Sequence, residues 1–587
     1  MEKSPGILFD EAFSHHEKGL LPEAEAGYRD VLATDPDHAE ALHFLGVLLH
    51  QKGEFEAAIK SIRHADQLTP GNPTILYNLG VVLQEAGDFE EAEIPYRNVV
   101  ELSPGHISAW VNLGNLLSDK GAHAEAIECH RNALKLQPDL AEHHLRLGTS
   151  LRRVGDIEGA MTQLGVALTL APDDAGIHSA LIETSPLEPG IDFQALAART
   201  REWSRRHAPR DTPPFSGQSK SLEDDSPLRI GFMMTDQIHS LAPRILPPLL
   251  EVFQRDPTVY TVCYANRRLS CPRHERSRKA SDLWQEIAEI PDGPLYQQIR
   301  ADQIDILIDL AGHAPGNRLS VVALRAAPVQ ISWMGAFDGS GMAAFDYLLT
   351  DEILLPGTHG SVITELPIHL SRHFVAREAP SDAPPISEPP LGRQGYPTFG
   401  CLAPPEMISY PIIQIWSELL HRSPDARLLL VGKGMEDPAI RTRLAGLFTS
   451  QGVAPERIRL LQADSESDAF AACRHIDLAL DPAPVSSYEG AFRALWMGVP
   501  VVTCPGDAPS SRLANSLLHF ADIEGSMAGD WGQYIDLALH LVEEKSLLTE
   551  VRHKIRPLIQ ASQIFDHGSF ADELLRRLRE IHSHSQA

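Results

Sequence analysis

The feature that most constrains this sequence is a 34-residue period in its first third. Four residue series keep this step: proline from Pro36 to Pro172, glycine from Gly19 to Gly155, alanine from Ala24 to Ala160, and a second glycine series from Gly46 to Gly148. Four registers that agree over this distance are not a chance pattern. The first third is therefore an array of similar units, and a chain of 587 residues has room for roughly three to four domain-sized parts in all.

The period and the residue types resemble tetratricopeptide repeats. In such repeats the glycine lets the first helix pack closely, the small alanine permits the helices to cross, and the proline ends the second helix. We expect five repeats over residues 3–174. They should stack into a superhelix whose concave groove is lined by the first helix of each repeat.

Two asparagines occupy one equivalent position of the repeat, two residues before the glycine. They are Asn78 and Asn112, and the same position holds Phe44 and Arg146 in other repeats. A carboxamide both donates and accepts, so a row of asparagines along a groove can hold an extended peptide backbone. The alternative is a solvated polar face that binds nothing. The repeats thus predict recruitment of a polypeptide rather than chemistry.

Composition narrows the partners and the compartment. The formal net charge is −28, from 51 basic and 79 acidic residues, which opposes sequence-independent binding to nucleic acid or anionic membranes. No stretch approaches 18 uncharged apolar residues, and the N-terminus lacks an apolar signal region, so we expect no membrane span. The six cysteines lie far apart without a C-x-x-C pair. They favour a reducing, cytoplasmic setting.

The pattern changes after the repeats. Residues 175–226 hold a helical segment followed by a stretch rich in proline, serine and charge, which marks a boundary. Short apolar runs then alternate with helical segments in two sets, 227–390 and 391–587. This alternation predicts parallel sheets, hence an α-helical superhelix followed by an α/β region of two Rossmann-like lobes, the second with C-terminal helices. Ligands of such sheets bind at the carboxyl ends of strands, so the cleft between lobes is the expected site.

Two segments carry a resemblance to a known family. "IDILIDLAGH…NRL…ALRAAPVQISWMG…GSG…DYLLTD" and "RALWMGVPVVTCPGDAPSSRLANSLL" resemble the first and second lobes of the O-linked N-acetylglucosamine transferase and SPINDLY family. The resemblance implies a glycosyltransferase B fold. It also implies inverting transfer of a sugar from a nucleotide donor to Ser or Thr hydroxyls, without a metal or a cofactor. Bacterial members of this build are thought to modify flagellins with nonulosonic acids, so the donor varies.

The segment "IDLALDPAPVSSYEGAFR" reads as a strand, a loop and a helix that begins near Tyr488. A helix N-terminus favours anions, so we expect it to hold the donor phosphates. Where the family has N-G-x-T-T-x-x-D, this chain has Tyr488, Glu489 and Gly490 in the hydroxyl region and Arg493 in the place of the aspartate. Ser487 or Glu489 could bind a ribose hydroxyl, and Arg493 a phosphate or carboxylate. Alternatively, Glu489 favours the helix start and Arg493 lies on a solvated face.

Three further positions in the second lobe bear on the donor. Met407 stands where the family has the lysine that contacts the diphosphate. Lys433 follows a strand directly and could replace that cation, although an exposed turn lysine is the alternative. Arg512 matches a Ser-Arg pair of the family, so the resemblance implies contact with the base or a role in holding the loop.

The first lobe supplies the candidate for proton transfer. His239 in "TDQIHSLAP" falls where the resemblance places the active-site histidine, although the segment is one residue shorter after Asp236. An imidazole there could take or relay the hydroxyl proton or steady the sugar phosphate. His313, in a Gly-His pair that also matches the family, is a weaker candidate with a positional role.

The segment "WMGAFDGSG" resembles a glycine-rich turn of the family. Its glycines would bring backbone N–H groups towards the donor, so Gly335, Gly339 and Ser340 are expected to bind it. No D-x-D stands at a strand end where it would hold Mg²⁺ or Mn²⁺. Protein groups must then stabilise the phosphate that leaves.

These observations support two hypotheses. The first is a protein O-glycosyltransferase that takes a nucleotide sugar and modifies a polypeptide held by the repeats. Because the donor site departs from the family, a sugar acid carried on cytidine monophosphate is one form of this hypothesis. The second is a transferase fold that no longer turns over and serves as a protein-binding scaffold.

Overall fold

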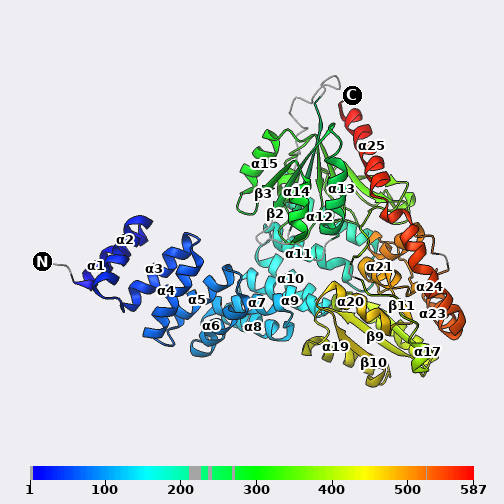
Figure 1. Cartoon of the computed structure of the whole chain (residues 1–587), viewed down its shortest axis with the longest axis horizontal. Coiled ribbons are helices and arrows are strands. Elements are labelled where there is room, and N and C mark those ends of the chain that lie inside the picture. Colours follow the sequence, from blue (N-terminus) through cyan, green and yellow to red (C-terminus); the bar gives the residue numbers. More distant parts are fainter. Residues whose placement is uncertain are drawn as a thin grey trace. The chain divides into compact units, whose positions relative to one another are not determined.

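The structure is a computed structural model that describes residues 4–209, 226–235, 241–266, 272–381, 383–523 and 525–586. The chain divides into two compact units, residues 1–150 and 151–587. The first is helical, and the second contains two parallel sheets, as the sequence predicts (Figure 1). Within the described ranges, no helix combines the length and the apolar character that a bilayer crossing requires.

The first unit is built from successive helix pairs, one pair for each 34-residue period. The first helix of each repeat ends before a glycine with a positive φ, such as Gly87 at 87° or Gly121 at 84°, a conformation that other residues adopt at a cost. The helices are α1 (Pro5–Glu17), α2 (Leu21–Thr34), α3 (Ala39–Gln51), α4 (Phe55–Leu68), α5 (Pro73–Glu85), α6 (Phe89–Leu102), α7 (Ile107–Lys120), α8 (His123–Leu136) and α9 (Ala141–Arg153), of which α9 crosses the unit boundary.

The second glycine series sets how closely the two helices of a repeat approach. A Cβ added at Gly80 in α5 would lie 2.7 Å from the ring of Tyr96 in α6. The same approach recurs one period away on either side, at Gly46 with Ile62 and at Gly114 with His130. The periodic glycine is therefore a packing requirement, as the sequence indicates.

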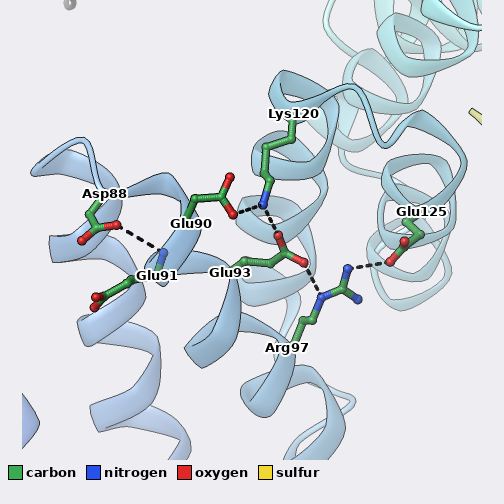
Figure 2. Close-up of polar contacts among 7 residues, drawn as sticks. All are labelled: Asp88, Glu90, Glu91, Glu93, Arg97, Lys120 and Glu125. Carbon is green, nitrogen blue, oxygen red and sulfur yellow. Dashed lines mark hydrogen bonds and ion pairs between the residues drawn. The ribbon is translucent and has the colours of Figure 1, made fainter. Parts of the chain in front are cut away.

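Ion pairs with the same period connect one repeat to the next. Lys120 donates to Glu90 at 2.9 Å and to Glu93 at 2.6 Å, and Arg97 bridges Glu93 at 2.7 Å and Glu125 at 2.6 Å (Figure 2). Equivalent pairs in earlier repeats are Lys52 with Glu25 and Arg63 with Glu91. Exposed pairs of this kind contribute little one by one and are screened by salt. They fix the register of neighbouring repeats more than they stabilise them.

The second unit begins with helices that follow the repeat pattern but pack on the α/β region. Trp203 and Ile182 share a core with Met233, and Ser179 Oγ lies 3.2 Å from His313 Nδ1. The division between the two compact units falls between residues 150 and 151, inside the fifth repeat, and the domain bound expected at residue 174 stays a prediction. The helices are α10 (Ile157–Leu170), α11 (Ala175–Thr184) and α12 (Phe193–His207).

The first sheet has seven parallel strands in the order β3-β2-β1-β4-β5-β6-β7. The expected strands are all present, while the two edge strands, β3 and β7, were not expected from the sequence. Edge strands are short and carry polar residues or proline, so their pattern is weak. The strands are β1 (Leu228–Thr235), β2 (Val259–Asn266), β3 (Leu283–Glu286), β4 (Ile306–Asp309), β5 (Val329–Ser332), β6 (Tyr347–Asp351) and β7 (Leu366–Leu370), and the helices are α13 (Ala242–Phe253), α14 (Pro272–Ala280), α15 (Asp292–Ala301) and α16 (Leu319–Ala323).

The second sheet has five parallel strands in the order β10-β9-β8-β11-β12. Its strands are β8 (Thr398–Leu402), β9 (Arg427–Gly432), β10 (Ile458–Gln462), β11 (Leu478–Leu480) and β12 (Val501–Val502). The helices of this part are α17 (Leu391–Gln394), α18 (Tyr410–Arg422), α19 (Pro438–Ser450), α20 (Glu466–Ala472), α21 (Tyr488–Trp496), α22 (Leu513–Phe520), α23 (Trp531–Glu543), α24 (Lys545–Ala561) and α25 (His567–Gln586).

The last helix returns to the first lobe. Helix α25, red in Figure 1, contacts α13, β5 and β7. Glu573 on this helix accepts hydrogen bonds from the Ser371 N–H at 2.7 Å and the Ser371 hydroxyl at 2.9 Å, and Arg372 Nε donates to it at 3.1 Å. The C-terminal helix, expected to belong to the second lobe, therefore ties the two lobes together.

Gly80→Ala should destabilise the repeats, because the added methyl group meets the Tyr96 ring. Overpacking costs about 1–3 kcal/mol, against which alanine gains about 1 kcal/mol of helix propensity. We expect a lower midpoint of thermal unfolding for the full chain. The control is Gly105→Ala, where nothing lies within 4 Å. Equal midpoints for the two variants would contradict the packing role of the glycine series.

Candidate functional site

Helix α21 begins where the loop after β11 ends, as the sequence predicts. Ser487 caps it: the hydroxyl accepts from the Gly490 N–H at 3.2 Å and donates to the Leu402 carbonyl at 3.1 Å. A Cβ on Gly490 would collide with the Leu402 carbonyl, so the helix start lies directly against the carboxyl end of β8. The Ser487 hydroxyl is thus engaged with the protein itself, and its contact with a donor stays a prediction.

A buried carboxylate, Asp481, holds the loop that leads into α21. It accepts hydrogen bonds from the Ser487 N–H at 2.9 Å, the Ser486 hydroxyl at 2.8 Å and the Thr503 hydroxyl at 2.7 Å. Burial raises the pKa of Asp481 to about 6, although these hydrogen bonds oppose the shift. The aspartate therefore joins the loops after β11 and β12 and fixes the position of the α21 N-terminus.

Three guanidinium groups surround the carboxylate of Glu489 in the first turn of α21. Arg244 Nη1 lies 2.8 Å from it, Arg377 Nη1 3.3 Å and Arg493 Nη2 3.6 Å. Arg244 also pairs with Glu466 at 2.5 Å. Burial alone would raise the pKa of Glu489, but Arg377, Arg244 and Arg493 outweigh it and lower this pKa to about 2. We call these five residues the arginine cluster.

Aromatic rings of α21 pack against the arginine cluster. The guanidinium carbon of Arg377 lies 3.3 Å from the centroid of the Phe492 ring, a cation–π contact, and Arg377 is only 4% exposed. The Tyr488 ring stacks on His373 with centroids 5.6 Å apart. Phe492 and Tyr488 both belong to α21, so this helix carries the cluster and its support.

The arginine cluster contains residues of both lobes that contact each other. Arg244 lies in α13 and Arg377 follows β7, both in the first lobe, whereas Glu466, Glu489 and Arg493 lie in α20 and α21 of the second. The alternative, in which Glu489 only favours the helix start and Arg493 lies on a solvated face, does not describe this arrangement. Contact of Glu489, Arg493 or Tyr488 with a donor remains a prediction.

The loop with Arg512 also bridges the lobes. Arg512 Nε donates to the Ile353 carbonyl at 2.7 Å, and Nη1 donates to the Gly506 carbonyl at 3.0 Å. Nearby, the Ser510 N–H donates to Asp338 at 2.9 Å. Of the two roles expected for Arg512, the observed contacts fit the one that holds the loop, and contact with a base stays a prediction.

The glycine-rich turn after β5 packs tightly against its neighbours. Gly335 lies against Gly312 of the loop after β4, so closely that neither position has room for a Cβ. Gly339 has a φ of 86°. Ser340 is fully buried, and its N–H donates to Glu365 at 2.6 Å. The Ser340 side chain lies inside the lobe, and donor binding by this turn is untested.

Two positions expected near the diphosphate differ in environment. Lys433 is exposed in the turn that follows β9. Met407 packs with Ile157 and Met161 of α10 and with Val485. The place where the resemblance puts a lysine is thus a small apolar cluster under the helical part of this unit.

The two candidate histidines of the first lobe are His239 and His313. His239 lies outside the described residues. His313 is buried, with its Nδ1 near the Ser179 hydroxyl and its ring 5.2 Å from that of Trp203. Burial lowers the pKa of His313 to about 3. A neutral imidazole that contacts α11 and α12 fits the positional role expected for it.

The two repeat asparagines lie in the first unit and bond to the preceding repeat. Asn78 Nδ2 lies 2.7 Å from His43 Nε2, and Asn112 Nδ2 lies 3.3 Å from the hydroxyls of Tyr77 and Tyr96. Both side chains are half-buried. The amide nitrogens therefore connect neighbouring repeats, and peptide binding by this row is untested.

Sequence reasoning missed Arg244, Arg377, Glu466 and Asp481. A usable signal existed for Arg244, which is the one charged residue in the apolar stretch "LAPRILPPLL". Charged residues in such surroundings are usually paired. For the other three, only the folded chain reveals the partner.

Comparison with known proteins connects this architecture to a family. A family model described as glycosyl transferase family 41 matches residues 207–377 and 406–574, and tetratricopeptide repeat models match residues 10–73, 73–106 and 107–140. A solved structure of a Lys-to-Met mutant of the O-GlcNAc transferase of Thermobaculum terrenum has a TM-score of 0.81 and 32% identity. The match covers 87% of this chain and 98% of that one.

Plant relatives match about two thirds of this chain. The tomato (Solanum lycopersicum) protein "Probable UDP-N-acetylglucosamine–peptide N-acetylglucosaminyltransferase SPINDLY" is 28% identical over 397 residues, 66% of this chain and 42% of that protein. The rice (Oryza sativa subsp. japonica) protein of the same name is 27% identical over 405 residues, 68% of this chain and 44% of that protein. This chain spans less than half the length of these curated relatives.

His313→Gln should weaken the pH dependence of stability. The folded pKa of about 3 lies below the usual value near 6.5, so between these values the unfolded chain binds the proton and stability falls as the pH falls. Removing the imidazole should reduce this slope by up to about 1.4 kcal/mol per pH unit. Urea unfolding at pH 7, 6 and 5 measures it. The control, His519→Gln at an exposed histidine, should keep the original slope; an unchanged slope in His313→Gln would contradict the buried neutral state.

Proposed function

The chain belongs to glycosyl transferase family 41, and from that membership we propose that it transfers a sugar from a nucleotide sugar to Ser or Thr of a polypeptide. The repeats recruit the polypeptide and the α/β unit carries out the transfer. The reaction inverts the sugar and takes the nucleotide sugar as its co-substrate, without a metal or a cofactor. The setting is the cytoplasm, which agrees with the unpaired thiols of the five described cysteines.

The observation that carries this proposal is the group of cations at the start of α21. A helix N-terminus stabilises an anion, and guanidinium groups bind phosphate and carboxylate with two parallel hydrogen bonds. Both stand where the strands of the second sheet end, the usual ligand position in a parallel sheet. The arrangement suits the departure of a nucleotide phosphate, which glycosyl transfer requires.

We propose that the donor is a sugar acid linked to cytidine monophosphate, with flagellin as the acceptor. Met407 leaves no cation at the position where the resemblance places a diphosphate lysine. A donor with one phosphate and one carboxylate has less need of that lysine and can use arginines instead.

The same departures favour a second candidate, a scaffold that binds protein partners without transfer. The observation in its favour is the apolar packing of Met407, because loss of one cation at a leaving group costs orders of magnitude in rate. The two candidates differ in a measurable product.

Co-expression tests transfer directly. The full chain is produced with the flagellin of the same genome in a host that makes a cytidine-linked sugar acid, and the flagellin mass is measured. We expect a gain of one or more sugar-acid masses, and no gain in a host that supplies only UDP-N-acetylglucosamine. Unmodified flagellin in both hosts, with flagellin still bound to the chain, would favour the scaffold.

His239→Ala tests the catalytic histidine that the resemblance implies. If its imidazole takes or relays the acceptor proton, transfer should fall by about 10²-fold or more at saturating acceptor, while donor affinity changes little. His519→Ala, at an exposed histidine of the second lobe, is the matched control. Normal turnover of the His239 variant would remove this residue from the mechanism.

A further inference from the structure

The arginine cluster has more positive than negative charge. It contains Arg244, Arg377 and Arg493 against Glu466 and Glu489. The α21 N-terminus adds a partial positive charge at the same place. A desolvated excess of cations is costly unless an anion completes it. The net charge of the cluster is therefore positive, and one more negative group would neutralise it.

Unused hydrogen-bond donors point the same way. Among the described residues, several buried side-chain atoms have no hydrogen-bond partner, and the Nε atoms of Arg377 and Arg493 are two of them. Arg377 is only 4% exposed. Buried donors without partners are rare in proteins and call for an explanation. An oxyanion within reach of these donors would supply it.

The cluster is also open enough to receive a ligand. The side chains of Arg244, Glu489 and Arg493 keep 16%, 20% and 19% of their exposure. Partial exposure lets a small anionic group reach the guanidinium groups from solvent.

We propose that Arg244, Arg377 and Arg493 form a subsite for one oxyanion of the nucleotide-sugar donor, and that Glu489 is its built-in counter-ion. This inference rests on the proposed function. Glu489 holds the three side chains in place and competes with the donor for them, so it limits donor affinity. Arg244 and Arg377 come from the first lobe, so the bound oxyanion joins the two lobes around the donor.

The two parts of the proposal predict effects of opposite sign. Arg244→Met and Arg493→Met each remove a cation, and we expect the Kd for the donor to rise at least tenfold. Arg244→Lys keeps the charge but loses the two-pronged geometry, so its loss should be smaller. Glu489→Gln removes the competitor, and donor binding should tighten about threefold or more. If Glu489 instead accepted a hydrogen bond from a ribose hydroxyl, the same change would weaken binding.

Calorimetric titration of the full chain with two probes separates the sources of the oxyanion. Cytidine monophosphate carries only the phosphate, whereas CMP-N-acetylneuraminic acid carries a carboxylate as well. Equal losses with both probes assign the subsite to the phosphate, and a loss confined to the second assigns it to the carboxylate. UDP-N-acetylglucosamine is run in parallel as a diphosphate donor.

The control is Arg422→Met, which breaks an exposed ion pair with Asp536 at 2.7 Å between α18 and α23 of the second lobe. It should leave every Kd unchanged, and near-ultraviolet circular dichroism checks that each variant is folded. Unaltered donor binding in Arg244→Met and Arg493→Met would overturn the subsite while the proposed transfer stands. Absence of nucleotide binding in the unchanged chain would overturn both.

Discussion

The α/β unit depends on one carboxylate. Glu489 holds arginines from both lobes at the point where a parallel sheet presents a helix N-terminus, and without it three guanidinium groups would face each other. Repulsion of this kind in a partly buried site is unfavourable, so an anion has to lie between the guanidinium groups, either Glu489 or one that a ligand supplies. The aromatic support under Arg377 and the cap at Ser487 both serve to keep that carboxylate in place. The charge balance at the start of α21 therefore also affects how the two lobes pack against each other.

The repeats follow a different constraint. Their geometry depends on the absence of a side chain, since Gly46, Gly80 and Gly114 let the two helices of a repeat touch. Ion pairs and asparagine contacts then tie each repeat to the next. Peptide recognition by the asparagine row would have to use what these internal bonds leave over, chiefly the carboxamide oxygens. The asparagine row thus connects neighbouring repeats, and a bound peptide would contact only the groups that these internal bonds leave available.

The fold could be predicted from the sequence to a large extent because its signals are local. Period, turn glycines and apolar runs gave the repeats and the inner strands of both sheets, whereas the edge strands β3 and β7 lack such a pattern. The site could be predicted only in part. Tyr488, Glu489 and Arg493 lie in one helix and share a motif, but Arg244, Arg377 and Glu466 come from distant segments. Only folding brings them together, and no spacing in the sequence records that a lone arginine in α13 will meet a glutamate in α21.

The charged residues around the start of α21 form one linked set. A glutamate at position 489 brings a negative charge to a helix start that would otherwise attract phosphate, and an arginine at position 493 and those at 244 and 377 reverse that effect. Meanwhile the methionine at position 407 contributes only apolar packing. The resemblance expects a lysine at position 407, whereas the structure places arginines at the junction of α13, α20 and α21. Under the proposed function, an anionic group of the donor would therefore bind at this junction.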